Sequence, residues 1–191
     1  YKNNAYLPIG FAADKSIMNY IGESKEQVEN QNELFRLATG LDENVFTAVS
    51  IKDVGHKGLN VVKQSVGNYS YQYNKPEDGS DDCYVKYNYT VPDDGPVYAV
   101  FFFDNTNGFQ VKKDGVTVHS FGNQKYKNVA ALGNFKAGDV ITLYSNVEKE
   151  KSGSGKVLVY QANEELLRQG IEKLSKGGIA VSDYSDTEIK G

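Results

Sequence analysis

The sequence predicts a mainly β protein, an antiparallel two-sheet β-sandwich that is jelly-roll-like, with two or three short helices and an N-terminal helical lid. From residue 45 to about residue 161, short strand-forming segments are separated by clusters of Gly, Asn, Asp and Pro at close, regular spacing. Such spacing is typical of antiparallel sandwiches and barrels. Outside this stretch, a segment near 25–39 and a segment after Asn163 have the apolar spacing of amphipathic helices.

About ten strands are expected from this pattern, enough for two sheets. They cover residues 45–51, 58–64, 69–74, 83–91, 97–104, 109–113, 116–121, 129–132, 140–146 and 157–161. In the segment 83–91, apolar and polar residues alternate, so one face should lie in the core. The residues of that face are Cys83, Val85, Tyr87, Tyr89 and Val91.

The segment 97–103 is apolar at every position and should therefore be a central strand buried on both faces. One face would point into the sandwich, and the other, with Tyr98, Val100 and Phe102, needs a cover. The amphipathic helix near 25–39 is the best candidate for this lid. Further along, Asp114-Gly115 predicts a tight hairpin turn between two paired strands, because both residue types tolerate positive φ.

The first helix is expected to begin at Ser24, with Gln27 completing a capping box, and to end at Gly40. Gln31 and Asn32 fall on or beside its apolar stripe, where their amides should hold a neighbouring loop.

The second helix should be capped by Asn163 and stopped by Gly177. Its first turn is acidic and its last turn is basic, which complements the helix dipole. The charged residues are Glu164, Glu165, Lys173 and Lys176, and the buried stripe is Leu166, Leu167, Ile171 and Leu174. Residues 179–181 could return as a short strand. We expect one compact domain, in which residues 1–44 pack on a sandwich with a C-terminal helix formed by residues 45–191.

Composition excludes several classes of protein. The 191 residues carry 21 basic and 25 acidic side chains, a net charge of −4, and show no run of basic residues, so no nucleic-acid partner is expected. Cys83 is the only cysteine and cannot form an internal disulfide. No segment reaches the 18 apolar residues of a membrane span. The start at Tyr1 suggests a piece of a longer polypeptide.

Motifs of catalysis and metal binding are largely missing, and no cofactor or catalytic residue is predicted. Two histidines, His56 and His119, and one cysteine cannot form a zinc site of the usual spacing. The segment Gly153–Lys156 lacks the leading glycine and the final hydroxyl of a phosphate loop.

Acidic pairs admit a glycosidase or a calcium site, but they lie in turn-rich segments where Asp is common. These pairs are Glu77 and Asp78, Asp81 and Asp82, and Asp93 and Asp94.

Tyrosines provide the one hint of a binding surface. The chain has 14 of them, and Tyr69, Tyr71 and Tyr73 share one face of an expected strand. An exposed row of this kind could stack on sugars, whereas such a row more often forms the edge of the core with its hydroxyls at the rim. The hypothetical glycan-binding patch combines these three residues with the loop residues Asp104, Asn105 and Asn107.

The N-terminal region resembles the YfhO-type bacterial membrane protein family. The resemblance lies in Leu7-Pro8-Ile9-Gly10-Phe11, in the stretch 29–35 (ENQNELF), in Thr39-Gly40 and in Asn44-Val45-Phe46. It continues more loosely to the stretch 160–165 (YQANEE).

The resemblance implies an extracytoplasmic β domain of a polytopic glycosyltransferase that uses a polyprenyl-phosphate sugar and modifies cell-wall polymers such as the teichoic acids of Gram-positive bacteria. The domain would lie on the extracellular face of the plasma membrane, joined to the membrane-embedded part of the same polypeptide. It would position the acceptor glycan without catalysing the reaction. The alternative is a secreted or surface-anchored carbohydrate-binding or adhesive module.

Overall fold

The computed structural model describes residues 12–24, 26–65, 70–74, 83–103, 108–122, 128–147 and 152–176. Within these ranges, the side chains at positions 53, 62–65, 70, 71, 102, 103, 128 and 152 are not described. The chain forms two compact units. A helical unit comprises Tyr1–Val45 and Glu164–Gly191, and a β unit comprises Phe46–Asn163. The C-terminal helix thus groups with the N-terminal helices, and the packing of residues 1–44 on the sandwich stays a prediction.

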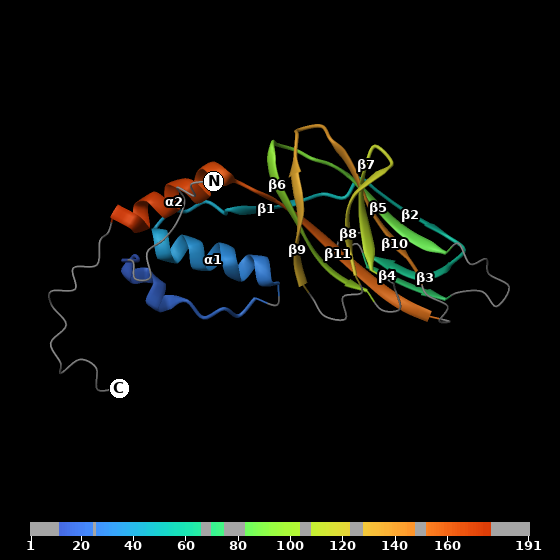
Figure 1. Ribbon diagram of the computed structural model, residues 1–191. Helices are drawn as coiled ribbons and strands as arrows, with labels where there is room; N and C mark the ends of the chain where they lie inside the picture. The colour runs from blue at the N-terminus through green and yellow to red at the C-terminus, as the bar shows by residue number, and fades with distance from the viewer. Residues whose placement is uncertain are drawn as a thin grey trace. The chain divides into compact units, whose positions relative to one another are not determined.

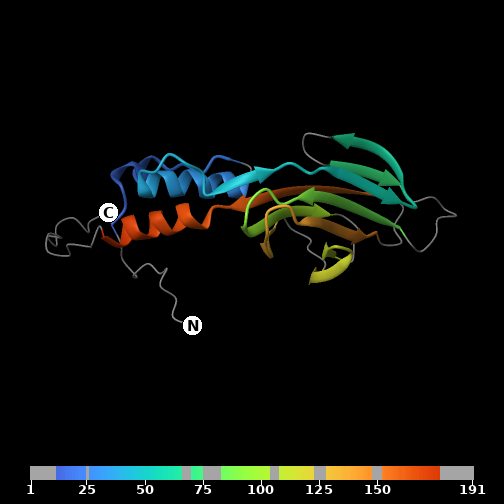
Figure 2. The ribbon, with the colours of Figure 1, turned by 90° about the horizontal axis from the view of Figure 1, so that it is seen from above.

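The helical unit contains a 3-10 helix η1 (Lys15–Asn19) and the helices α1 (Gln27–Thr39) and α2 (Glu164–Lys176). In both views of the molecule α1 and α2 lie side by side (Figure 1, Figure 2). Gly170 permits this approach, because a Cβ there would lie 2.4 Å from Cε2 of Phe35. Of the predicted α2 stripe, Leu166 and Leu174 are buried, whereas Leu167 is 39% exposed.

The start of α1 differs from the capping box predicted at Ser24. Glu26 occupies the N-cap without a side-chain hydrogen bond, and Ser24 Oγ instead accepts a hydrogen bond from the Glu26 amide. Asn30 ties the segment before the helix to its first turn: its side chain accepts from the Ser24 amide at 3.0 Å and donates to the Ser24 carbonyl at 2.9 Å. The predicted end is confirmed, since Gly40 has φ 64° and donates to the Arg36 carbonyl. Asn32 is fully buried.

The β unit is an antiparallel two-sheet sandwich, as the sequence predicts. The first sheet has the order β3-β4-β11-β6-β9, with β1 also paired to β11, and the second has the order β2-β5-β10-β7-β8. The strands are β1 (Phe46–Val49), β2 (Asp53–Lys57), β3 (Asn60–Ser65), β4 (Ser70–Asn74), β5 (Tyr84–Thr90), β6 (Gly95–Phe103), β7 (Phe109–Lys113), β8 (Val116–Phe121), β9 (Asn128–Phe135), β10 (Val140–Asn146) and β11 (Ser152–Ala162). Figure 1 labels all of them.

The core between the sheets is built from the predicted face of β5 and its counterparts. Cys83, Val85, Tyr87, Tyr89 and Val91 are each at most 3% exposed, which confirms the alternation read from the sequence. They belong to one cluster with apolar residues of β6, β7, β9, β10 and β11.

Strand β6 has hydrogen-bonded neighbours on both sides, β11 and β9, and is buried on both faces at the described positions. Val97, Ala99 and Phe101 lie in the core cluster, and Val100, on the opposite face, is only 4% exposed. Tyr98 on that face is partly buried. This agrees with the predicted two-sided burial.

The predicted turn between β7 and β8 is confirmed, whereas one strand and one strand boundary differ from the prediction. Asp114 (φ 51°) and Gly115 (φ 81°) form the expected turn between β7 and β8. Strand β2 was not predicted. Strand β11 covers Ser152–Ala162, whereas the sequence predicted a strand only over 157–161. Gly153 and Gly155 are strand residues opposite Tyr73 and Tyr71.

Candidate functional site

The outer face of the sheet β2-β5-β10-β7-β8 gathers polar and aromatic side chains in rows across the strands. The strand registers place Gly55, Lys86, Tyr144, Gln110 and Ser120 in one row, from β2 to β8. A neighbouring row contains Lys57, Tyr84 and Asn146, and the row on the other side contains Asp53, Asn88, Thr142, Lys112 and Thr117. These positions alternate with the core residues of the same strands. We call this surface the polar face.

Two tyrosines form the centre of the polar face. The rings of Tyr84 and Tyr144 lie 4.8 Å apart between centroids, inclined at 37°. The Lys112 ammonium lies 4.0 Å from the centroid of Tyr144, which is a cation–π distance. Both rings are partly buried, and the pair forms an aromatic surface with a cation over the face of Tyr144.

A glycine shapes one side of this aromatic surface. Gly55 in β2 lies opposite Lys86, and a Cβ there would lie 2.7 Å from Cε of Lys86. The missing side chain leaves room for the lysine stem to lie across the sheet. Since the charged head of a lysine stays in water while its stem packs, Lys86 adds a cation to the polar face.

A concavity of about 130 Å³ lies at the end of the sheet where β7 begins and where β8 and β10 end. Gln110, Ser120, Tyr144 and Asn146 provide its polar lining. Gly108, Phe109 and Phe121 complete the wall. The lining therefore combines hydrogen-bonding groups with ring surface, which suits a small polar ligand or one unit of a longer one.

Cross-strand hydrogen bonds hold the polar face in place. Thr142 Oγ1 donates to Asn88 Oδ1 at 2.7 Å, and Thr117 Oγ1 donates to Gln110 Oε1 at 3.4 Å. Behind the concavity, Ser145 Oγ donates to the Gly108 carbonyl at 2.8 Å. The lining residues are thus supported by their own sheet.

The glycan patch predicted from the sequence lies mostly outside the described residues. The residues of this patch that are not described are Tyr69, Asp104, Asn105 and Asn107, and the side chain of Tyr71 is not described either. Tyr73 is a correction: its ring is 2% exposed and belongs to the core cluster, so it offers no stacking surface. This face of β4 is therefore the inner one, since Tyr73 packs in the cluster between the two sheets.

The sequence analysis missed Tyr84 and Tyr144 as a pair. Tyr84 stands on the polar side of the alternation in the segment 83–91, which marked it as outward-facing. Tyr144 alternates in the same way with Ile141 and Leu143. Their proximity depends on the β5–β10 register, which no local pattern shows.

The structure also places several of the residues considered for metal binding and catalysis. Among the described residues no group of three His, Cys, Asp or Glu side chains could hold a metal ion. Gly153–Lys156 lies in the extended strand β11, so its backbone differs from that of a phosphate loop. The ring centroids of His119 and Phe121 lie 4.5 Å apart, so this histidine packs against an aromatic side chain.

Of the acidic pairs, Asp93 and Asp94 are described, and Asp94 has a structural role. Its carboxylate accepts hydrogen bonds from Lys136 Nζ at 2.7 Å and from the Ala137 amide at 2.9 Å. These bonds, chiefly the one from Lys136, hold the pKa of Asp94 below its usual value. Asp139 accepts from Lys113 and from the Lys136 amide in the same way. The residues Glu77, Asp78, Asp81 and Asp82 lie outside the described part.

The family model described as bacterial membrane protein YfhO matches residues 1–191. The chain belongs to the YfhO family of bacterial membrane proteins. This confirms the resemblance seen in the sequence. Within the described ranges, neither helix has the length and apolar character that crossing a bilayer requires. Comparison with curated proteins gives no match.

Several solved structures similar to this YfhO-family chain are carbohydrate-binding modules. A family 35 module from Clostridium thermocellum is 14% identical and has a TM-score of 0.39, over 62% of this chain and 98% of that one. CsCBM6-3 from Clostridium stercorarium, in complex with cellobiose, is 14% identical with a TM-score of 0.36, over 62% and 95% of the two chains. A family 35 module from Paenibacillus barcinonensis is 10% identical with a TM-score of 0.37, over 62% and 98%. At these identities the likeness concerns the sandwich fold.

Proposed function

We propose that this chain is a glycan-binding accessory domain of a YfhO-family membrane protein, and that the polar face holds the glycan. The observation that carries the proposal is the Tyr84–Tyr144 ring pair beside a concavity lined by Gln110, Ser120 and Asn146. Sugars present apolar C–H faces and hydroxyl groups together. An aromatic surface with amide and hydroxyl neighbours matches both.

The residue types of the polar face suit binding better than acid–base or nucleophilic catalysis. It offers amides, hydroxyls, phenols and ammonium groups, and the strand registers place one acidic position on it, Asp53, whose side chain is not described. A glycosidase needs two facing carboxylates across a cleft. We therefore assign this domain the positioning of an acceptor glycan, while the chemistry would belong to the membrane-embedded part of the same polypeptide.

The family resemblance extends the proposal to the parent protein. The parent protein would be a polytopic glycosyltransferase of Gram-positive bacteria that modifies teichoic acids. This domain would lie on the extracellular face of the plasma membrane. A surface-anchored carbohydrate-binding module would use the same face. The two proposals differ in whether membrane spans flank the domain.

Charge on the polar face favours an anionic polymer despite the net charge of −4. Lys57, Lys86 and Lys112 occupy adjacent rows. A net negative charge taken alone disfavours an anionic polymer, so that stacking and hydroxyl recognition would dominate its binding. With the lysines gathered on one face, ionic attraction to phosphate adds to these contacts and should weaken with salt.

Calorimetric titration of the chain with teichoic acid fragments and with neutral oligosaccharides tests the proposal. Tyr144→Leu keeps an apolar side chain but removes the ring and hydroxyl, and we expect affinity to fall at least about tenfold, or about 1.4 kcal/mol. Tyr98→Leu is the matched control: Tyr98 is a partly buried tyrosine on the other sheet, 5.4 Å from Phe46 in an edge-to-face contact. It should leave affinity unchanged.

Two results would contradict the proposal. One is equal loss of affinity in both variants, which would indicate a general effect on the fold. The other is the absence of heat with every glycan at millimolar concentration while the chain remains folded.

A further inference from the structure

Three large apolar or aromatic side chains stand exposed within four residues of the helical unit. Met18 is 82% exposed, Ile21 is 68% exposed and Tyr20 is 37% exposed. Single exposed apolar residues are ordinary on a protein surface, whereas a group of them on one short segment marks an interaction site. We call these three residues the apolar tip.

The backbone leading to the apolar tip is fixed to α1, so the exposure belongs to an ordered segment. The Asp14 amide donates to the Ala38 carbonyl at 2.7 Å, and Ser16 Oγ donates to the Leu37 carbonyl at 2.8 Å. The Asp14 carboxylate caps η1 by accepting from the Ser16 amide at 2.9 Å.

The end of the segment is fixed as well. The Tyr20 amide donates to the Ile17 carbonyl at 3.0 Å and closes the last turn of η1. Gly22 has φ 62°, and a Cβ there would lie 2.9 Å from the Tyr20 hydroxyl, so the ring folds back over this glycine. None of the η1 residues is buried, and Met18 is the most exposed of its apolar side chains.

The chemistry of the segment is that of a bilayer interface. From Lys15 to Gly22 it contains one lysine and no acidic residue, in a chain whose net charge is −4. Tyrosine is enriched at the level of lipid headgroups, aliphatic side chains reach the acyl boundary, and a flanking lysine can extend to the phosphates. The tip thus matches a lipid surface in polarity, and the exposed acidic residues Asp14 and Glu23 flank it.

Size argues against a protein occupant. Stable interfaces between proteins bury about 800 Å² on each partner, with about 20–30 residues a side. Three side chains on one turn fall well short of that. A lipid surface needs no such area when the protein is already held at the membrane, as a domain of a membrane-protein family is.

We propose that the apolar tip inserts into the headgroup region of the lipid bilayer and holds the helical unit against the membrane. Met18 and Ile21 would enter the acyl boundary, and Tyr20 would lie at the headgroups. Contact would be weak and reversible, because so small an apolar area gives only marginal membrane affinity without a tether.

The absence of tryptophan from the chain provides a direct test. The Ile21→Trp variant carries a single tryptophan at the tip. The Val118→Trp variant carries one on β8, where Val118 is 49% exposed, and is the matched control. Each full chain is tethered through a C-terminal hexahistidine tag to vesicles of phosphatidylglycerol and phosphatidylethanolamine containing a nickel-chelating lipid.

We expect the emission of the Ile21→Trp variant to shift to shorter wavelength on tethering, and lipids brominated on the acyl chains to quench it. The Val118→Trp variant should show neither effect. Adding Met18→Ser and Tyr20→Ser to Ile21→Trp should reduce the shift and the quenching.

Two outcomes would overturn the proposal. The first is an unchanged spectrum for the folded and tethered Ile21→Trp variant, or equal quenching of both variants. The second is a shift that depends on protein concentration without vesicles, which would assign the tip to contact between two copies of the chain.

Discussion

Gly108 forms one wall of the concavity and has a backbone conformation that other residues rarely adopt, with φ 103°. A Cβ at this position would lie 2.1 Å from the carbonyl oxygen of Phe121, a backbone atom that cannot move aside cheaply. We expect Gly108→Ala to lower the free energy of unfolding by about 3 kcal/mol or more, because steric overlap adds to the strained φ. Urea denaturation measures this.

Gly122 is the matched control for this prediction. A Cβ there would meet no atom of the described residues within 4 Å, and Gly122→Ala should change stability by no more than about 0.5 kcal/mol. Equal effects of the two substitutions would show that the wall of the concavity is less tightly packed than described.

Individual site residues were the least predictable part of the protein. The alternation in the segment 83–91 correctly assigned Tyr87 and Tyr89 to the core and Tyr84 to the surface. The same reasoning could not decide the direction of Tyr73, because alternation defines two faces without saying which is inner. Tyr73 proved to be a core residue. The approach of Tyr84 to Tyr144 arises from pairing between strands more than 50 residues apart, and local sequence carries no record of that register.

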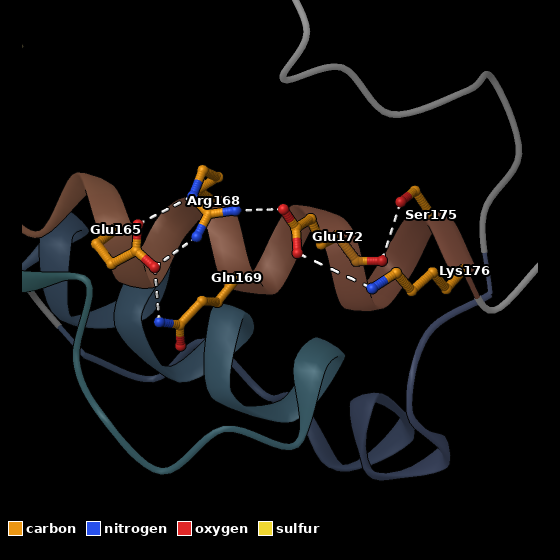
Figure 3. Close-up of polar contacts among 6 residues, drawn as sticks. All are labelled: Glu165, Arg168, Gln169, Glu172, Ser175 and Lys176. Carbon is orange, nitrogen blue, oxygen red and sulfur yellow. Dashed lines mark hydrogen bonds and ion pairs between the residues drawn. The ribbon is translucent and has the colours of Figure 1, made fainter.

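At the scale of elements, helix α2 carries a charged network on its exposed side (Figure 3). Arg168 donates to both carboxylate oxygens of Glu165, at 2.9 and 2.6 Å, and also contacts Glu172. Gln169 adds a hydrogen bond to Glu165 at 3.0 Å. Together these bonds, chiefly those from Arg168, lower the pKa of Glu165 to about 2.

The depressed pKa predicts how α2 responds to acid. Because the folded-state pKa of Glu165 lies below its ordinary value of 4.5, the stabilisation is complete above that value and is lost as pH falls toward 2. NMR titration of the carboxyl carbon measures the pKa. Arg168→Met should raise it toward 4.5, and Lys52→Met in the β unit should not. An unchanged pKa in Arg168→Met would refute the assigned cause.

Elements with strong local signals were predicted well. The Asp114-Gly115 turn, the Gly40 helix end and the apolar strand β6 all follow from the residues that form them. Strand β2 was missed because its sequence, Asp53–Lys57, contains a glycine and charged residues. It is an edge strand, so pairing with β5 stabilises it more than its own propensity does. Helix η1 likewise depends on hydrogen bonds to the distant α1.

For the whole molecule, the core cluster lies entirely within the β unit. We therefore expect a fragment of residues 46–163 to fold by itself and to keep the near-ultraviolet circular dichroism of a packed core. The predicted helical lid adds a second expectation. If residues 1–44 cover the outer face of β6, their removal should expose Tyr98 and Val100, and the fragment should bind more of a hydrophobic dye than the full chain does.

The lid prediction has a clear contrary result. Equal dye binding by the folded fragment and by the full chain would mean that the outer face of β6 needs no helical cover. Failure of the fragment to fold would instead show that the sandwich depends on the helical unit for stability.

The central claim is that the polar face of this YfhO-family domain binds a glycan. The most direct measurement is an NMR titration of the isotope-labelled chain with teichoic acid fragments and neutral oligosaccharides. We predict chemical shift changes concentrated at the amides of Tyr84, Lys86, Gln110 and Tyr144, larger at low salt for the anionic ligand. Shifts confined to the sheet of β6 and β9 or to the helical unit, or no shifts at millimolar ligand, would contradict the claim.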